Sequence, residues 1–266
     1  MDKICRYLIS AFFVYKEKQQ NNKKVVDKCV KNTLLCFGSK KMNINDPRYK
    51  NQGLHVVLSL FTVHKGKFKV LLIKRKNEPY KNKWILIGGC AYNTETGTEA
   101  MNRELYEKTH IKNIDFEMFD VFTNPNRSPN MRMVAIGYIG VSDAGIIESF
   151  KQTEKASDAD WFEIDRVPEL GYDHKEILDK AIETLKIKVF TTNIMKKLYP
   201  DKFTLPELQQ TYEKILDTKL DRRNFRKKLI LAKIIEETNQ TIKTENVKAT
   251  KLYKFTDNDV SFSLYK

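Results

Sequence analysis

Two acidic side chains one turn apart are the residues of this chain best suited to chemistry. Glu104 and Glu107 follow a helix-capping signal, Thr96 with Glu99 three residues later. Residues three or four apart share one helix face, so we expect both carboxylates to point the same way. Such a pair can hold a hard cation such as Mg²⁺, which bridges carboxylates to the phosphate oxygens of a ligand. For a Glu-x-x-Glu pair taken alone, the alternative is an ordinary solvated helix face.

Two glycines and two cations accompany this pair. Gly88 and Gly89 end an apolar stretch just before the helix. Because glycine has no Cβ, the phosphates of a ligand can approach the backbone closely there. Arg103 directly precedes Glu104, and Lys108 falls one turn after it on the same face. We therefore predict that Gly88, Gly89, Arg103 and Lys108 bind a ligand.

The wider spacing resembles the Nudix box, G-x5-E-x7-R-E-U-x-E-E-x-G-U, in which U is a bulky apolar residue. The matching residues are Gly89, Glu95, Arg103, Glu104, Leu105, Glu107 and Ile111. The resemblance implies the α/β/α sandwich of the Nudix fold, with Mg²⁺ bound by Glu104 and Glu107. These two would be the catalytic residues if the chain hydrolyses a diphosphate. Lys108 departs from the pattern, because it stands where the family has glutamate, and after Thr109 the family's glycine is replaced by His110.

The lysine bears directly on metal binding. Lys108 removes one anionic ligand and adds a positive charge beside the ion. Two unit charges about 4 Å apart interact by roughly 4 kcal/mol at an effective dielectric near 20. We therefore expect the affinity for Mg²⁺ to be weakened. Since lysine can neutralise a phosphate directly, the site is better suited to binding a nucleotide diphosphate than to cutting it.

Length and composition narrow the class of protein. The 266 residues suffice for one large domain or two small ones, and 41% hydrophobic with 31% charged residues is globular composition. No apolar run approaches the ~20 residues of a membrane-spanning helix. The four cysteines show no Cys-x-x-Cys spacing, which argues against structural zinc and favours reduced thiols in a cytoplasmic protein.

The net charge of +14 is concentrated at the two ends. Residues 1–41 hold ten Lys/Arg against three Asp/Glu, and residues 195–266 hold sixteen against ten. Such asymmetry is typical of nucleic-acid contact by a terminal segment. The alternative is a lysine-rich, AT-biased coding sequence. We interpret residues 1–41 as a weakly ordered basic extension, or as the product of an upstream start codon chosen in error.

Residues 42–189 form the predicted Nudix domain. Hydrophobic alternation predicts strands at 55–63, 67–74, 114–123 and 132–142, with a short one from Ala159, and a helix at 173–186. Between two of these strands lies a turn flanked by Arg127 and Arg132. Two arginines can clamp a diphosphate bidentately, although a solvated hairpin tip is an equal alternative. Nudix proteins that handle ADP-ribose have a similar turn near the ligand, which favours a ligand-binding role.

Residues 190–266 form a second predicted domain. Residues 190–198 read as helical, Thr204 with Glu207 forms another capping box, and Asp221 caps a basic helix. The buried stripe of this helix is Phe225, Leu229 and Ala232. Residues 234–256 alternate loosely, as a β-hairpin wing would. The pattern predicts a winged helix-turn-helix, with a basic helical accessory domain as the alternative.

Five polar residues near the start of this helix are of the types that reach base edges and phosphates in a major groove. These predicted DNA-binding residues are Arg222, Arg223, Asn224, Arg226 and Lys227. Residues 203–209 and 221–228 also resemble the winged helix domain of NrtR-type regulators, which are Nudix-related transcription factors. The chain is thus expected to be α+β, with a Nudix sandwich on a mixed sheet followed by a small winged helix-turn-helix domain.

The resemblance implies a regulator whose degenerate Nudix domain senses ADP-ribose or a related sugar nucleotide. Its partners would be double-stranded DNA and a second copy of the chain, with no membrane. One alternative is an active Mg²⁺-dependent hydrolase of ADP-ribose or another nucleoside diphosphate derivative. A further alternative, motivated only by the basic ends, is an RNA-associated Nudix protein.

Overall fold

The computed structural model describes residues 46, 51–149, 158–199, 201–242 and 249–257. The predicted extension, residues 1–41, lies outside this set. Residues from Asn51 onward form one compact unit. Among the described residues, no helix is long and apolar enough to cross a membrane.

A mixed sheet forms the frame of the Nudix domain. In the described part of the chain it has seven strands: β1 (Gln52–His64), β2 (Lys67–Lys74), β3 (Trp84–Ile85), β4 (Ile87–Cys90), β5 (Phe116–Phe122), β6 (Arg132–Val141) and β7 (Asp158–Glu163). The order is β3-β2-β1-β6-β5, with β4 paired to β1 and β7 paired to β2. The pairing of β1 with β6 is parallel, whereas the other pairs are antiparallel.

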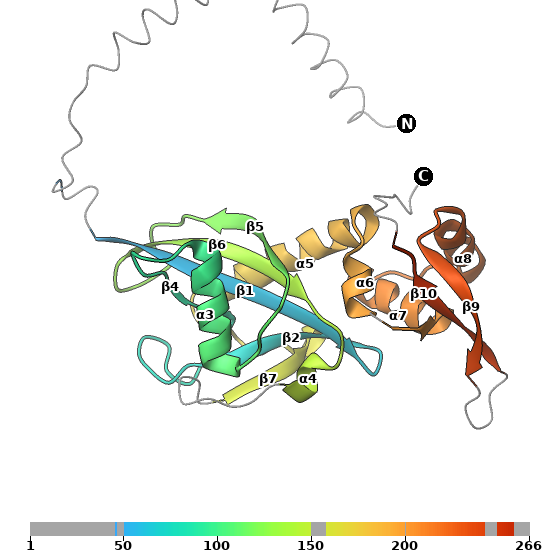
Figure 1. Ribbon diagram of the computed structural model, residues 1–266. Coiled ribbons are helices and arrows are strands. Elements are labelled where there is room, and N and C mark those ends of the chain that lie inside the picture. Colours follow the sequence, from blue (N-terminus) through green and yellow to red (C-terminus); the bar gives the residue numbers. More distant parts are fainter. Residues whose placement is uncertain (1–45, 47–50, 150–157, 200, 243–248, 258–266) are drawn as a thin grey trace, which may run out of the picture. The chain divides into compact units, whose positions relative to one another are not determined.

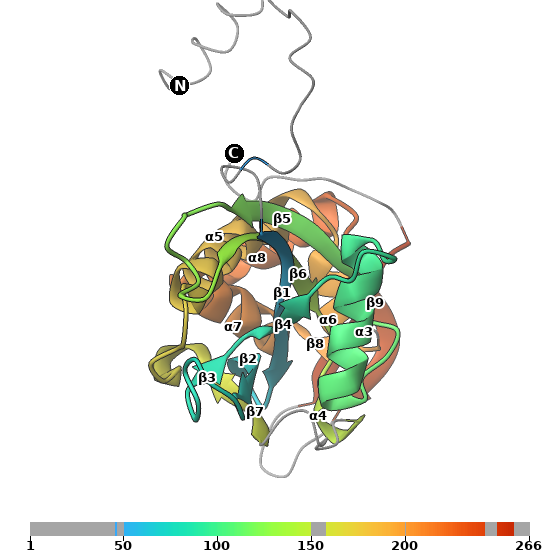
Figure 2. The same ribbon diagram turned by 90° about the vertical axis from the view of Figure 1, so that its left-hand side faces the viewer.

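The central strand β1 contributes side chains to two hydrophobic cores, because alternate residues point to opposite faces of the sheet. Val56, Leu58 and Leu60 pack on the face covered by α3 (Gly97–Thr109). Val57 and Phe61 point to the opposite face, which α5 (His174–Thr191) covers. Figures 1 and 2 show the sheet between these two helices. A period of two along one strand therefore produces the predicted α/β/α sandwich.

The capping signal of α3 forms as predicted. The Thr96 hydroxyl accepts from the Glu99 backbone N–H, and the Glu99 carboxylate accepts from the Thr96 N–H. Met101 and Leu105 are fully buried against the sheet. Each such side chain contributes about 1.5–3 kcal/mol. This packing fixes the direction of the opposite, charged face of the helix, which carries the Nudix-box residues.

The helix α5 is longer than the sequence pattern predicts, since it continues to Thr191, across the predicted domain boundary at 189/190. The single helix predicted over 190–198 is interrupted, because Thr192 is extended and α6 (Ile194–Leu198) starts anew. The Thr192 hydroxyl accepts from the backbone N–H of Ile194, which favours a break at this point. The short elements α4 (Ile146–Ser149) and η1 (Ile164–Arg166) complete the Nudix domain.

The C-terminal domain is a winged helix-turn-helix, as predicted. Its elements are α6, β8 (Phe203–Thr204), α7 (Leu205–Leu216), α8 (Arg222–Leu231), β9 (Ile235–Ile242) and β10 (Thr250–Phe255). The capping box at Thr204 is present, and Asp221 caps α8 by accepting from the Asn224 N–H at 2.8 Å. Strands β8, β10 and β9 form the small sheet that supplies the wing.

Candidate functional site

The Nudix-box side chains converge on Arg103. Its guanidinium donates to both oxygens of Glu95, at 2.6 and 2.9 Å, and to Glu104 at 2.6 Å. It lies 3.3 Å from Glu107 and 4.1 Å from the Tyr92 ring centroid. The bonds from Arg103 also lower the pKa of Glu95. Arg103 thus holds three carboxylates in place, and we interpret it as a positioning residue.

The carboxylate of Glu104 is enclosed by two cations. Its Oε1 accepts from Arg103 at 2.6 Å, and its Oε2 lies 2.8 Å from the Nζ of Lys108. A Cβ at Gly89 would lie 2.1–2.3 Å from this carboxylate, so only glycine leaves room for it. The carboxylate therefore packs directly on the glycine backbone, and both of its oxygens have cationic partners.

Lys108 lies against the first glycine. Besides Glu104, its ammonium contacts the carbonyl oxygen of Gly88. A Cβ at Gly88 would meet the Val56 backbone oxygen at 2.2 Å, so this glycine is required by close strand packing. The lysine side chain is only 15% exposed. The Lys108 side chain therefore lies between strand β4 and helix α3.

This donor set does not fit a divalent cation. A metal ion at Glu104 would have to displace Arg103 and Lys108 and would then lie beside two positive charges. In the described part of the chain, no group of three or more His, Cys, Asp or Glu side chains is placed to hold a metal. Mg²⁺ prefers several oxygen ligands in near-octahedral geometry, which these residues do not provide.

A cavity of about 350 Å³, here called the central pocket, opens beside these residues. Its lining comes from the Nudix domain: the sheet strands, including the two glycines of β4, together with α3, the turn before β6 and the start of α5. The lining residues are His55, Arg75, Ile85, Gly88, Gly89, Cys90, Glu104, Lys108, Arg127, Ser128, Asn130, Met131, Met133, Tyr172 and His174. Three cations and one carboxylate make this lining suited to an anionic ligand.

Arg127 is held at the pocket by a buried ion pair. Its Nε and Nη2 both donate to Asp173, each at 2.8 Å. The Arg127 side chain is 2% exposed. Asp173 is the N-cap residue of α5, yet its carboxylate makes no cap hydrogen bond because it is engaged by the arginine. The pair therefore fastens the turn before β6 to the first turn of α5.

Arg75 differs from the other two pocket cations. Its guanidinium donates to the carbonyl oxygens of Pro79 and Glu78 and lies 5.2 Å from the Tyr172 ring centroid. Within the described residues, the structure shows no carboxylate paired with it. The positive charge of Arg75 is therefore uncompensated at the pocket.

Two buried histidines present unsatisfied nitrogens. Desolvation and neighbouring cations lower the pKa of His55 to about 3 and lower the pKa of His174 as well, so both are neutral. The backbone N–H of Leu86 donates to Nδ1 of His174 at 2.9 Å, which places the proton of that ring on Nε2. His174 Nε2 and His55 Nδ1 have no hydrogen-bond partner among the described residues. A buried donor without a partner is costly, so a ligand oxygen is its natural complement.

The structure brings together only some of the predicted ligand-binding residues. Gly88, Gly89, Glu104, Lys108 and Arg127 line the central pocket. Three others do not belong to the lining. Arg103 donates to Glu104 and Glu107, and neither Arg103 nor Glu107 lines the pocket. Arg132 instead donates to the Thr123 carbonyl oxygen at 2.6 Å.

Sequence reasoning missed Arg75, His55, Tyr172 and His174. They come from the start of β1, the end of β2 and the start of α5, so only the sheet topology brings them together. A weak signal existed for His174, which sits beside the N-cap residue of a clear amphipathic helix. No local pattern marks Arg75 or His55.

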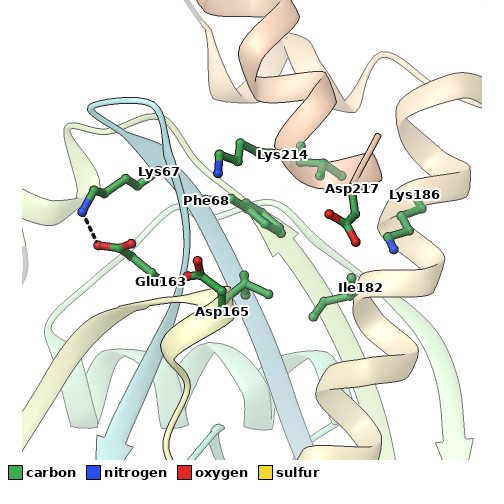
Figure 3. A pocket seen from close by; sticks show the side chains of 10 residues that line it. Lys67, Phe68, Glu163, Asp165, Ile182, Lys186, Lys214 and Asp217 are labelled. Carbon is green, nitrogen blue, oxygen red and sulfur yellow. Dashed lines mark hydrogen bonds and ion pairs between the residues drawn. The ribbon is translucent and has the colours of Figure 1, made fainter. Parts of the chain in front are cut away.

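A second hollow, of about 290 Å³, lies among β2, α5 and α7 (Figure 3). Its charged lining residues are balanced, with three lysines and three carboxylates: Lys67, Lys186, Lys214, Glu163, Asp165 and Asp217. Figure 3 shows Lys67 paired with Glu163 at its edge. Since its charge is balanced, this hollow suits a dianionic ligand less well than the central pocket.

The basic helix α8 turns its charges outward. Phe225 and Leu229 are buried, and Phe225 packs edge-on against Tyr212 of α7. All five predicted DNA-binding residues are exposed: Arg222, Arg223, Asn224, Arg226 and Lys227. Arg226 also lies 3.8 Å from Glu237 on the wing. Arg222, Arg226 and Lys251 line a hollow between α8 and the wing, and Glu237 forms ion pairs with both Arg226 and Lys251.

Comparison with known proteins agrees with this two-part structure. Residues 53–181 match the NUDIX domain, and residues 196–255 match the NrtR DNA-binding winged helix domain. The chain is 30% identical over 220 residues to an "ADPR responsive transcriptional repressor NtrR" of Acinetobacter baylyi, covering 81% of this chain and 86% of the relative. An "ADP-ribose pyrophosphatase" of Methanocaldococcus jannaschii is 31% identical over 125 residues, covering 47% of this chain and 72% of that protein.

A solved structure resembles both domains together. NrtR of Shewanella oneidensis, in a complex with a 27mer DNA, superposes with a TM-score of 0.65 at 28% identity and covers 76% of this chain and 93% of that one. A match over 76% of this chain is longer than either domain alone. Because both domain models match and the Acinetobacter relative is similar over 86% of its length, the chain belongs to the NrtR family of Nudix-related transcriptional regulators.

Proposed function

We propose that this protein is an ADP-ribose-responsive regulator that binds double-stranded DNA through α8. One observation carries the proposal: a basic helix of winged helix type keeps its charges exposed, in the same chain as a Nudix pocket lined by three cations. Arg222, Arg223 and Asn224 lie at the helix N-terminus, the part that contacts base edges in helix-turn-helix proteins. Arg226 and Lys227 would contact bases or phosphates one turn later.

ADP-ribose is the effector that the pocket chemistry favours. Its diphosphate would lie among Arg75, Lys108 and Arg127, next to the glycine backbone. The relatives that respond to or cleave ADP-ribose support this choice by their similarity. Tyr172, whose ring lies 4.6 Å from that of Tyr80 by centroids, offers an aromatic surface at the pocket wall.

We further propose that the protein acts in the cytoplasm as a homodimer. A dimer would place two α8 helices on two half-sites of a palindromic operator, one helical turn or a multiple of it apart. Sedimentation of the protein with and without operator DNA tests this part. A monomer that binds a single half-site with full affinity would contradict it.

The central test is a gel-shift with DNA from upstream of the gene, with and without ADP-ribose. A ligand changes DNA affinity only by the difference between its affinities for the two protein states. We expect ADP-ribose to change the affinity for DNA by about 5- to 150-fold, the usual range of such coupling. Retardation that is identical with and without ADP-ribose would contradict the proposed effector.

A hydrolase is the second candidate, favoured by the retained Glu104 and Glu107 and by the similarity to a pyrophosphatase. The ion pairs of Glu104 with Arg103 and Lys108 argue against a hydrolase, because they occupy both carboxylate oxygens that would bind a metal. We expect no turnover of ADP-ribose with Mg²⁺ at micromolar enzyme. Robust release of AMP in that assay would show that the protein is an enzyme.

A further inference from the structure

The lysine in the Nudix box suggests how this pocket binds its ligand. Lys108 stands at the position of a family glutamate, and its ammonium lies 2.8 Å from the main candidate metal ligand, Glu104. It also contacts the Gly88 carbonyl oxygen and lines the central pocket. A positive charge is thus already fixed where the family pattern would place a cation between carboxylate and phosphate.

We propose that Lys108 replaces the divalent cation, so that this protein binds a diphosphate ester without any metal. The inference rests on the proposed function only in that the ligand carries a diphosphate. Lys108 would hold the phosphate oxygens as a permanent charge, and Glu104 would hold Lys108 in place. Glu104 changes its role accordingly, from ligand of a metal to partner of a lysine.

The charges around Glu104 support the replacement of a divalent cation by Lys108. Each of its two oxygens has one cationic partner, Arg103 on one side and Lys108 on the other. The side chains of all three residues are at most 18% exposed, so water screens these pairs weakly. A divalent ion could enter only by breaking both pairs and by approaching two like charges.

The rest of the pocket offers donors that need no metal. His174 presents its Nε2–H without a partner among the described residues, and the bond from Leu86 to Nδ1 fixes this tautomer. Arg75 adds a charge for which the structure shows no carboxylate partner in the described part of the chain. This lining supplies hydrogen-bond donors and positive charge. A diphosphate, which carries several anionic acceptor oxygens, complements it.

The first experiment measures metal binding to the ligand-free protein. Mn²⁺ is titrated and followed by electron paramagnetic resonance for the wild type, Lys108→Glu and Lys112→Glu. We expect Lys108→Glu to bind Mn²⁺ at least about tenfold more tightly than the wild type and Lys112→Glu, which corresponds to about 1.4 kcal/mol. Lys112 is exposed just after α3 and lies outside the pocket lining, so Lys112→Glu controls for the change in net charge. Wild-type protein that binds Mn²⁺ as tightly as Lys108→Glu would overturn the inference.

The second experiment measures ligand affinity by calorimetry, with inorganic pyrophosphate and with ADP-ribose, in EDTA and in Mg²⁺. The wild type should bind equally well in both buffers. Lys108→Gln, which removes the positive charge without adding a negative one, should lose about 10- to 100-fold in both, as expected for one charge-assisted hydrogen bond. A wild-type affinity that falls more than about tenfold in EDTA, or a Lys108→Gln variant that binds like the wild type, would refute the role of Lys108.

The two probes separate this inference from the proposed effector. Metal-free binding of pyrophosphate but not of ADP-ribose would leave the role of Lys108 intact and refute ADP-ribose as the ligand. Binding of both probes only in Mg²⁺ would refute the role of Lys108 and leave the effector intact. The Mn²⁺ titration gives its answer whichever ligand the protein binds.

Discussion

The cations of the central pocket and those of α8 differ in what surrounds them. In the pocket, Arg127 is buried against Asp173, and Lys108 is held by Glu104. On α8, Arg222 and Arg223 are exposed, and among the described residues no carboxylate is paired with either. A small ligand is bound most tightly by groups that are already in position, because little ordering entropy is lost. DNA binding instead uses solvated cations. These side chains neutralise phosphates and release the counterions that are condensed on the DNA backbone.

This difference in burial predicts that substitutions in the pocket affect stability, whereas substitutions on α8 affect DNA binding. Removing a pocket cation or its partner should destabilise the fold, because the remaining charge stays buried. Removing an α8 cation should change DNA binding and leave stability nearly unchanged, because these side chains are solvated. Unfolding and DNA affinity therefore respond to different sets of substitutions.

The largest effect is expected at Asp173. Asp173→Asn leaves Arg127 buried without a full charge partner, and breaking such a pair costs about 3–5 kcal/mol. Urea unfolding measures the loss. Asp179→Asn is the matched control, because Asp179 belongs to an exposed pair with Lys175 on the same helix and should cost less than about 1 kcal/mol. If the two variants lose the same free energy of unfolding, burial does not make the Arg127–Asp173 pair stronger than the exposed Lys175–Asp179 pair.

The next effect concerns α8. Replacing Arg222 and Arg226 together by alanine should weaken operator binding by about 100-fold or more, since each good arginine–base contact is worth about 1–3 kcal/mol. Fluorescence anisotropy with labelled DNA measures the affinity, and urea unfolding should show unchanged stability.

The matched control for the α8 variant replaces Arg166 and Lys175, two exposed cations of the Nudix domain, by alanine. It carries the same change in net charge and should bind DNA nearly as the wild type does. Unchanged, salt-sensitive DNA binding in the α8 variant would place the DNA contacts on another surface.

A third effect is the dependence of stability on pH. The pKa of His55 is about 3 in the folded protein because of burial and nearby Arg127, whereas an unfolded histidine has a pKa near 6.5. As the pH falls below about 6.5, the unfolded chain takes up a proton that the folded chain does not, so stability is lost on acidification. His55 alone should remove about 2 kcal/mol by pH 5.

Thermal unfolding between pH 7.5 and pH 5 checks this prediction. His55→Gln should flatten the dependence on pH, although it removes a pocket side chain. Replacement of the exposed His110 by glutamine should leave the slope as in the wild type. If the slope is the same in all three proteins, His55 is not its source.

The smallest effect separates phosphate contacts from base contacts. Lys227→Ala should lower the affinity similarly for operator and random DNA. If Lys227 neutralises one phosphate, the slope of log K against log salt concentration should become shallower by about 0.9 in this variant. Arg223→Ala should instead reduce the preference for the operator. A Lys227→Ala variant with an unchanged salt slope would show that Lys227 does not touch a phosphate.

The sequence predicts those features whose cause is local. The capping boxes at Thr96 and Thr204 and the cap at Asp221 join residues three apart, and all three form. The strand β2 begins and ends where its pattern indicates, because hydrophobic alternation is read within one strand. The buried stripe of α8 follows in the same way, since Phe225 and Leu229 lie one turn apart.

Features that depend on distant contacts could not be predicted. The bond from Leu86 to His174 joins residues 88 apart, and that from Arg127 to Asp173 joins residues 46 apart. Asp173, the first residue of the helix predicted at 173–186, is the N-cap residue of α5, and its carboxylate pairs with a distant arginine. Arg132 and Arg127 look alike in the same turn, yet only Arg127 lines the pocket.

The unbroken course of α5 has a mechanical consequence. Its 18 residues extend roughly 27 Å at 1.5 Å per residue. One end is tied to the pocket through Asp173, whereas Leu185 and Val189 near the other end share a core with Leu208 and Tyr212 of the winged helix domain. A continuous helix that is packed at both ends in this manner connects the pocket wall to the core of the winged helix domain. If a ligand in the pocket shifts Asp173, we expect the shift to reach the winged helix domain through this one helix.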